Sequence, residues 1–222
     1  YRNFFRRINN SKILNILALH SQGFFMRKLY SLCFLFLTVS GFAQTYQEHY
    51  EKGAGLWQTQ RDSAYFHFEK ALEQAYIEED YEYILPIYDY IIYIDGYYYD
   101  LPKLGIDIER LNKVLKQDSA KISSTLYDEY LKETLLNKAN YFYKLNDFSN
   151  AKKTLSHLER EILKINLEDK PIDFDLKLES VYSYFGSIFK WENKYQLAED
   201  YYLKAIDVVE NNPKSFQSPL GE

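Results

Sequence analysis

The sequence has few of the residues that support covalent or metal chemistry. Of its 222 residues one is cysteine, one is methionine and four are histidine. Cys33 lies near the N-terminus, and the residues after it contain no thiol for a disulfide, a zinc site or a nucleophile. The histidines lack metal-type spacing. No glycine-rich phosphate loop, nucleophile elbow or zinc-binding helix motif is present. The sequence therefore predicts no enzyme active site, no metal and no cofactor within this stretch.

Acidic residues are absent from the first 43 residues, which contain six basic ones. Residues 44–222 reverse this balance, with 21 basic and 32 acidic residues. A nucleic-acid-binding surface needs basic side chains that neutralise phosphates. The acidic main part of the chain therefore argues against a nucleic-acid partner.

The N-terminal region contains a segment typical of a secretory signal peptide. Met26-Arg27-Lys28 precedes the apolar run Leu29–Val39, and Gly41-Phe42-Ala43 offers small residues for cleavage after Ala43. The apolar run is short for a transmembrane helix. We expect an upstream or artefactual segment at 1–25, a signal peptide at 26–43, and an exported protein, periplasmic or at the cell surface, without membrane insertion after cleavage. An organellar transit peptide and an uncleaved anchor are the alternatives.

Beyond Thr45 the sequence predicts one helix after another, and no low-complexity linker interrupts them. Aromatic residues make up 18% of the chain, with 23 tyrosines, which suits helix pairs whose rings pack inward while hydroxyls reach water. Apolar residues at helical spacing predict helices at Tyr46–Gln60, Asp62–Ile77, Tyr81–Asp95, Leu101–Gln117, Lys121–Leu145, Asp147–Ile165, Phe174–Glu192 and Lys194–Glu210. The third has strand-like composition, but a strand there would have no sheet to join, and Gly96 is expected to end it.

A spacing of apolar and small residues occurs twice in the second half of the chain. The later copy consists of Tyr182, Phe185, Gly186, Phe189, Tyr195, Ala198, Tyr202 and Ala205. The earlier copy, 47 residues before it, consists of Leu135, Lys138, Ala139, Phe142, Phe148, Ala151, Leu155 and Leu158. Small residues let two antiparallel helices approach, and Asn146 and Asn193 suit the left-handed conformation at the turn.

This pattern resembles the tetratricopeptide repeat, a helix–turn–helix unit of about 34 residues. The resemblance implies an all-α fold: a right-handed superhelical solenoid of antiparallel helix hairpins. It would span 44–222 in about four helix pairs and continue beyond 222. The first pair carries the pattern only in its second helix, because Lys52 occupies the small-residue position. An ordinary helical hairpin in a bundle is the alternative.

The resemblance also implies a function, because the first helices of such arrays line a binding groove. The expected groove residues are Leu136, Asn140, Tyr143, Lys144, Ser183, Ser187, Lys190 and Trp191. Some members clamp a partner's terminal carboxylate with asparagines; Asn140 matches but Ser187 does not, so no such clamp is expected. We expect an exported bacterial scaffold that binds a protein or peptide. The alternatives are the N-terminal recruiting or sensory region of a larger enzyme, such as a caspase-like (CHAT) protease or a histidine kinase, and a structural spacer. The oligomeric state is not predicted.

Overall fold

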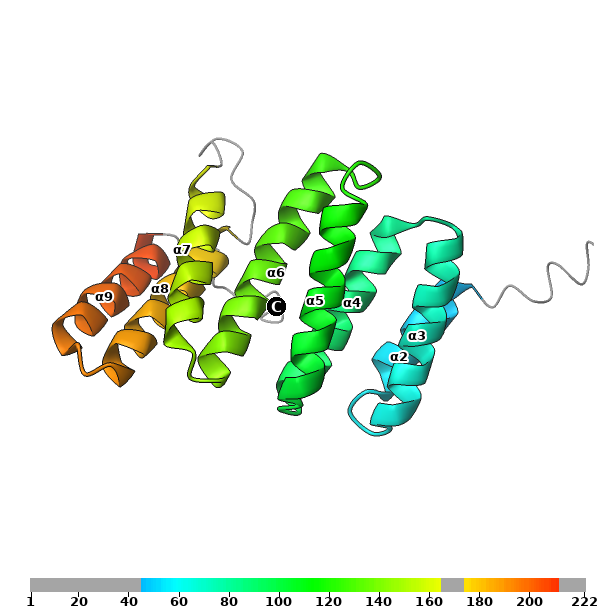
Figure 1. Cartoon of the computed structure of the whole chain (residues 1–222), viewed down its shortest axis with the longest axis horizontal. Helices are drawn as coiled ribbons and strands as arrows, with labels where there is room; N and C mark the ends of the chain where they lie inside the picture. The colour runs from blue at the N-terminus through cyan, green and yellow to red at the C-terminus, as the bar shows by residue number, and fades with distance from the viewer. Residues whose placement is uncertain (1–44, 165–173, 212–222) are drawn as a thin grey trace, which may run out of the picture. The chain divides into compact units, whose positions relative to one another are not determined.

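A computed structural model describes residues 45–164 and 174–211, and these residues form eight α-helices (Figure 1). The helices are α2 (Tyr46–Leu56), α3 (Arg61–Ile77), α4 (Tyr81–Tyr97), α5 (Leu101–Gln117), α6 (Ser124–Lys144), α7 (Phe148–Leu163), α8 (Phe174–Trp191) and α9 (Tyr195–Asn211). The predicted all-α fold is confirmed, including a helix rather than a strand at α4. The predicted signal peptide and upstream segment lie outside the described residues.

Two helix ends differ by more than two residues from the sequence-based boundaries. α2 ends at Leu56 rather than Gln60, and α6 begins at Ser124 rather than Lys121. The start of α6 is set by Ser123, whose hydroxyl oxygen accepts a hydrogen bond from the Leu126 amide. This cap satisfies one of the amides that a helix leaves free at its N-terminus.

The helices pack mainly with their neighbours in sequence, as antiparallel pairs: α2 with α3, α4 with α5, α6 with α7 and α8 with α9 (Figure 1). The backbones of the first helices of successive pairs, α2, α4, α6 and α8, also approach one another, whereas those of the second helices of the described pairs do not; α3 and α5 meet through side chains, as in the Arg110–Glu69 ion pair. Contacts that reach only the next pair are consistent with a helical repeat.

One tight turn recurs at four helix junctions. Its central residue takes a left-handed conformation, with φ between 53° and 58°, at Glu79, Tyr99, Asn146 and Asn193. The next amide donates to a carbonyl five residues earlier, as from Asp147 to Phe142 at 2.9 Å. This bond closes the helix end as a Schellman-type turn.

These turns test the predicted helix ends. The left-handed conformation expected at Asn146 and Asn193 is confirmed. The prediction that Gly96 ends α4 is wrong, since α4 continues to Tyr97 and Tyr99 takes the left-handed conformation. The turn is fixed there by the Asp100 amide, which donates to the Asp95 carbonyl at 3.0 Å. Tyrosine therefore adopts a conformation that its side chain disfavours.

The 47-residue period includes the second helix pair, where the sequence showed no match. Tyr99, Asn146 and Asn193 are each 47 residues apart. Three hydrogen bonds also join residues 48 apart on successive first helices: Asn137 to Asp89, Lys144 to the Gly96 carbonyl, and Trp191 to Tyr143. Lys144 and Trp191 occupy equivalent positions one period apart, so a hydrogen bond at this position recurs from α4 to α6 and from α6 to α8.

Glycine allows close helix contact in the first and last pairs. A Cβ built on Gly186 would lie 2.8 Å from the ring of Tyr202, and one built on Gly53 would lie 2.8 Å from the ring of Phe68. The assignment of Lys52 to this position is therefore wrong. Phe68 follows Gly53 by one residue fewer than Tyr202 follows Gly186, because α2 ends at Leu56, soon after its glycine, whereas α8 continues to Trp191.

The buried side chains form two clusters. The first joins α3, α4 and α5 with Trp57 and Ile122 from the adjoining turns. The second joins α6, α7 and α8, and α9 adds the partly buried Tyr201 and Val208. The described part of the chain thus has two cores, one for each two helix pairs.

Candidate functional site

A pocket of about 360 Å³ lies where the ends of α6 and α8 meet the start of α9. It is lined by Tyr143, Ser187, Lys190, Trp191, Tyr195 and Tyr202. We call it the aromatic pocket, because four of these six residues carry aromatic rings. Trp191 and Tyr195 are each 66% exposed, so a ligand can reach both rings from solvent.

Hydrogen bonds and ring contacts hold the walls of the aromatic pocket. The Trp191 indole N–H donates to the Tyr143 hydroxyl at 3.1 Å, and the Tyr143 ring meets the Tyr184 ring edge-on at 5.5 Å. The hydroxyls of Ser187 and Tyr202 lie 3.2 Å apart and form a hydrogen bond. Burial raises the pKa of Tyr184 to about 12, so this supporting ring stays neutral. The pocket is therefore braced before any ligand arrives.

The charges at the rim of the pocket are unequal. Lys190 is exposed and makes no ion pair with any described residue. Glu192 is held by Lys152 and Lys194, and these hydrogen bonds lower the pKa of its carboxyl group. Rings beside an unpaired cation suit a ligand that has an apolar or aromatic group next to a carboxylate.

The structure brings together four of the eight predicted groove residues, namely Tyr143, Ser187, Lys190 and Trp191. The other four do not line this pocket. Two pocket residues that were not predicted as groove residues, Tyr195 and Tyr202, come from α9. Both residues belong to the repeat pattern in the sequence, but Tyr202 was interpreted there as a residue that only packs between the helices.

The remaining predicted groove residues have contacts within the protein. Leu136 packs against the second core cluster, and Ser183 donates to Glu179 at 2.5 Å. Lys144 donates to the Gly96 carbonyl at 2.9 Å and lies 4.2 Å from the ring centroid of Tyr99; burial lowers its pKa. Asn140 is half-buried on α6. Ser183 and Lys144 are thus engaged within the protein rather than free for a partner.

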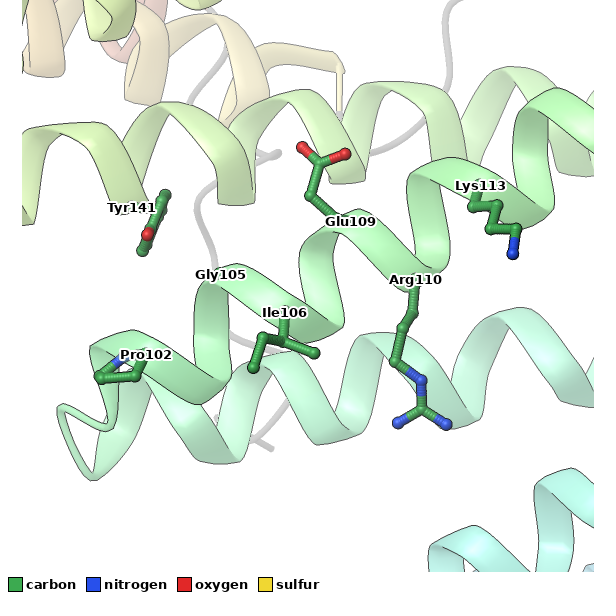
Figure 2. Close-up of a pocket in the computed structure, with 7 residues that line it drawn as sticks. All are labelled: Pro102, Gly105, Ile106, Glu109, Arg110, Lys113 and Tyr141. Atoms are coloured by element: carbon green, nitrogen blue, oxygen red, sulfur yellow. The ribbon is translucent and has the colours of Figure 1, made fainter.

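A second hollow, of about 470 Å³, lies on α5 beside α6 (Figure 2). Figure 2 shows Tyr141 of α6 facing Gly105, with Glu109 and Arg110 on different sides of α5. Glu109 is paired with Lys138 and Arg110 with Glu69. Of its charged lining residues, only Lys113 has no ion pair in the described part of the chain. This hollow was not predicted. It offers a ligand fewer aromatic rings than the aromatic pocket does, because Tyr141 is the one aromatic residue in its lining.

Two histidines that are separated in sequence meet between α2 and α3. The Nδ1 atoms of His49 and His67 lie 2.9 Å apart, and burial lowers the pKa of His49. No group of three or more histidine, cysteine, aspartate or glutamate side chains suited to a metal ion occurs within residues 45–164 and 174–211.

Among the helices that the structure describes, none has the length and apolar character needed to cross a bilayer. Comparison with protein-family models, with curated proteins and with solved structures gives no match for this chain. The likeness to tetratricopeptide repeats therefore rests on the residue pattern and on the sequential hairpins of the fold.

Proposed function

We propose that this chain is a protein-interaction scaffold of the tetratricopeptide type, and that the aromatic pocket receives a side chain of a protein or peptide partner. One observation carries the proposal. Four residues expected at a binding groove come together in one pocket, beside an exposed tryptophan and an unpaired lysine.

The physical argument concerns the exposed rings. Tryptophan and tyrosine bury large apolar areas at little cost in conformational entropy, and they are enriched where interfaces gain most of their binding energy. Trp191 is held in place by its hydrogen bond to Tyr143, so its side chain loses little conformational entropy on binding.

Export and a right-handed superhelix belong to the same proposal. The residue pattern at 26–43 supports export. Close backbone approach between successive first helices, without such approach between the described second helices, supports a curved array. The first helices then lie on the inner side, where α6 and α8 contribute Tyr143, Ser187, Lys190 and Trp191.

The proposal can be tested by selecting peptides from a random library on the immobilised chain. Binding of the enriched peptides is then measured by fluorescence in a Trp57→Phe background, in which Trp191 is the only tryptophan. We expect enriched peptides to shift Trp191 emission to shorter wavelength. Measured by isothermal titration calorimetry, Trp191→Ala should weaken their binding at least tenfold, which corresponds to about 1.4 kcal/mol.

Lys113→Gln serves as the matched control, since it removes an exposed, unpaired lysine from the second hollow. It should leave peptide binding unchanged, whereas Lys190→Gln should weaken it. Peptides that bind the wild type and Trp191→Ala equally well would contradict the proposal.

A further inference from the structure

Two carboxylates are buried between α3, α4 and α5. Asp95 of α4 is fully buried, and Asp107 of α5 is 2% exposed. One oxygen of Asp95, Oδ1, accepts a hydrogen bond from the Tyr65 hydroxyl. The other oxygen, Oδ2, is buried without a hydrogen-bond partner. An ionised carboxylate oxygen left in this state is costly, so the arrangement needs an explanation.

The cations on α3 do not supply the missing partner. Arg61 lies 3.9 Å from Oδ1 of Asp95, but it lies 2.6 Å from Asp100 in the α4–α5 turn. The shorter pair engages the guanidinium group at the edge of the cluster. Tyr65, the other polar group that α3 directs at Asp95, already donates its one proton to Oδ1.

The cations on α5 and α6 also have other contacts. The Lys103 ammonium lies 2.8 Å from the ring centroid of Tyr65, and burial lowers its pKa. Arg110 pairs with Asp107 at 2.9 Å and with Glu69 at 2.8 Å. On α6, Lys144 donates to the carbonyl of Gly96. Two carboxylates therefore lie together with no cation bound to Oδ2 of Asp95.

A proton on Oδ2 would satisfy this oxygen. Burial raises the pKa of Asp95 to about 7, and the neighbouring carboxyl group of Asp107 adds to the rise. Two adjacent buried carboxylates cannot both ionise at low cost, so the pair retains one proton. The protonated Oδ2 then donates to Asp107, while Asp107 keeps its charge paired with Arg110.

We propose that Asp95 and Asp107 share one proton in mildly acidic and neutral solution, and that loss of this proton loosens the contact of α4 with α3 and α5. The sign follows from linkage. The native state keeps the proton up to about pH 7, whereas the unfolded chain releases it near 3.8. Stability therefore falls as pH rises through this window, and the penalty is complete above it.

Asp95→Asn tests the proposal in the full chain, because an amide presents a permanent N–H donor to Asp107 and an oxygen to Tyr65. Thermal midpoints are measured from pH 5.5 to 8. We expect the wild-type midpoint to fall by about 5 °C as the proton is lost. The Asp95→Asn midpoint should show a clearly smaller fall and should exceed the wild-type value at pH 8.

Asp89→Asn is the matched control on the same helix. Burial raises the pKa of Asp89 to about 6, so this acid contributes to the pH dependence at the lower end of the range. Asp89→Asn should remove only that lower part and leave the fall between pH 6.5 and 8. An Asp95→Asn variant with the same fall as the wild type would overturn the proposal, as it would show that Asp95 is ionised throughout.

A measurement on the wild type needs no variant to fold. With carboxyl-¹³C-labelled aspartate, one carboxyl resonance should titrate near pH 7, well above the unperturbed pKa. If no aspartate carboxyl titrates above pH 6.5, the shared proton does not exist. Both experiments leave the aromatic pocket untouched, so the outcome is independent of the proposed binding function.

Discussion

The two halves of the described array differ in how clearly they carry the repeat pattern and in how many large side chains they bury completely. α6–α9 carry the repeat pattern clearly, yet ten of the twelve largest fully buried side chains lie in α3–α5. The half that departs from the pattern therefore buries more of its large side chains completely. The pattern marks where two helix backbones approach closely. It does not measure how much apolar surface the surrounding side chains bury.

The second helix pair shows how the departure works. Ile92 and Leu104 of α4 and α5 stand where the last pair has Gly186 and Ala198. Both large residues are buried, and α4 contacts α5 less extensively than the first helix contacts the second in the other pairs. In this pair, large side chains stand between the two helices in place of the small residues that allow close backbone approach. The carboxylates Asp95 and Asp107 also lie in this wider junction.

The largest expected effect compares the ring beneath each glycine. Phe68→Ala should destabilise the protein by about 4 kcal/mol, because its ring is fully buried. Tyr202→Ala should cost about 2 kcal/mol, since its ring is partly exposed at the aromatic pocket. Urea unfolding followed by circular dichroism gives both values. Fluorescence in single-tryptophan backgrounds, with either Trp57 or Trp191 replaced by phenylalanine, reports on each half separately. A larger loss at Tyr202 would reverse the comparison.

A smaller effect should be the same in both halves. Gly53→Val and Gly186→Val each place side-chain atoms against a ring, and we expect each to cost about 2–3 kcal/mol. Gly55→Ala is the control, because nothing lies within 4 Å of its added Cβ. That variant should be neutral or gain about 0.5 kcal/mol from helix propensity. A cost at Gly186 but not at Gly53 would show that only the matched half depends on close helix approach.

The smallest expected effect concerns the turns. Asn146→Ala and Asn193→Ala should each lose about 1 kcal/mol, because alanine tolerates the left-handed conformation less well than asparagine. Tyr99→Asn should relieve the same strain in the other half. It also removes the ring beneath Lys144, so its gain should be smaller than the asparagine losses. Differential scanning calorimetry resolves these shifts. Stability unchanged in both alanine variants would mean that the turn residues do not contribute.

Sequence alone predicted the helices and the two asparagine turns, because periodicity and turn chemistry are local signals. It missed Tyr99 as a turn residue, since packing of α4 against α5 imposes that conformation without a local signal. It assigned the small-residue position to Lys52 instead of Gly53, because the early end of α2 at Leu56 could not be inferred. It found four residues of the aromatic pocket through the repeat pattern. The Asp95–Asp107 pair was invisible, because those carboxylates meet only after three helices pack.

The constant offset of the connections between successive first helices has an evolutionary consequence. Each connection joins a residue to one 48 positions later, and α6 carries both a donor for α4 before it, Lys144, and an acceptor for α8 after it, Tyr143. An in-frame duplication of one whole unit would bring both halves of the connection along. Such a duplication would lengthen the array without requiring a new kind of hydrogen bond between successive first helices.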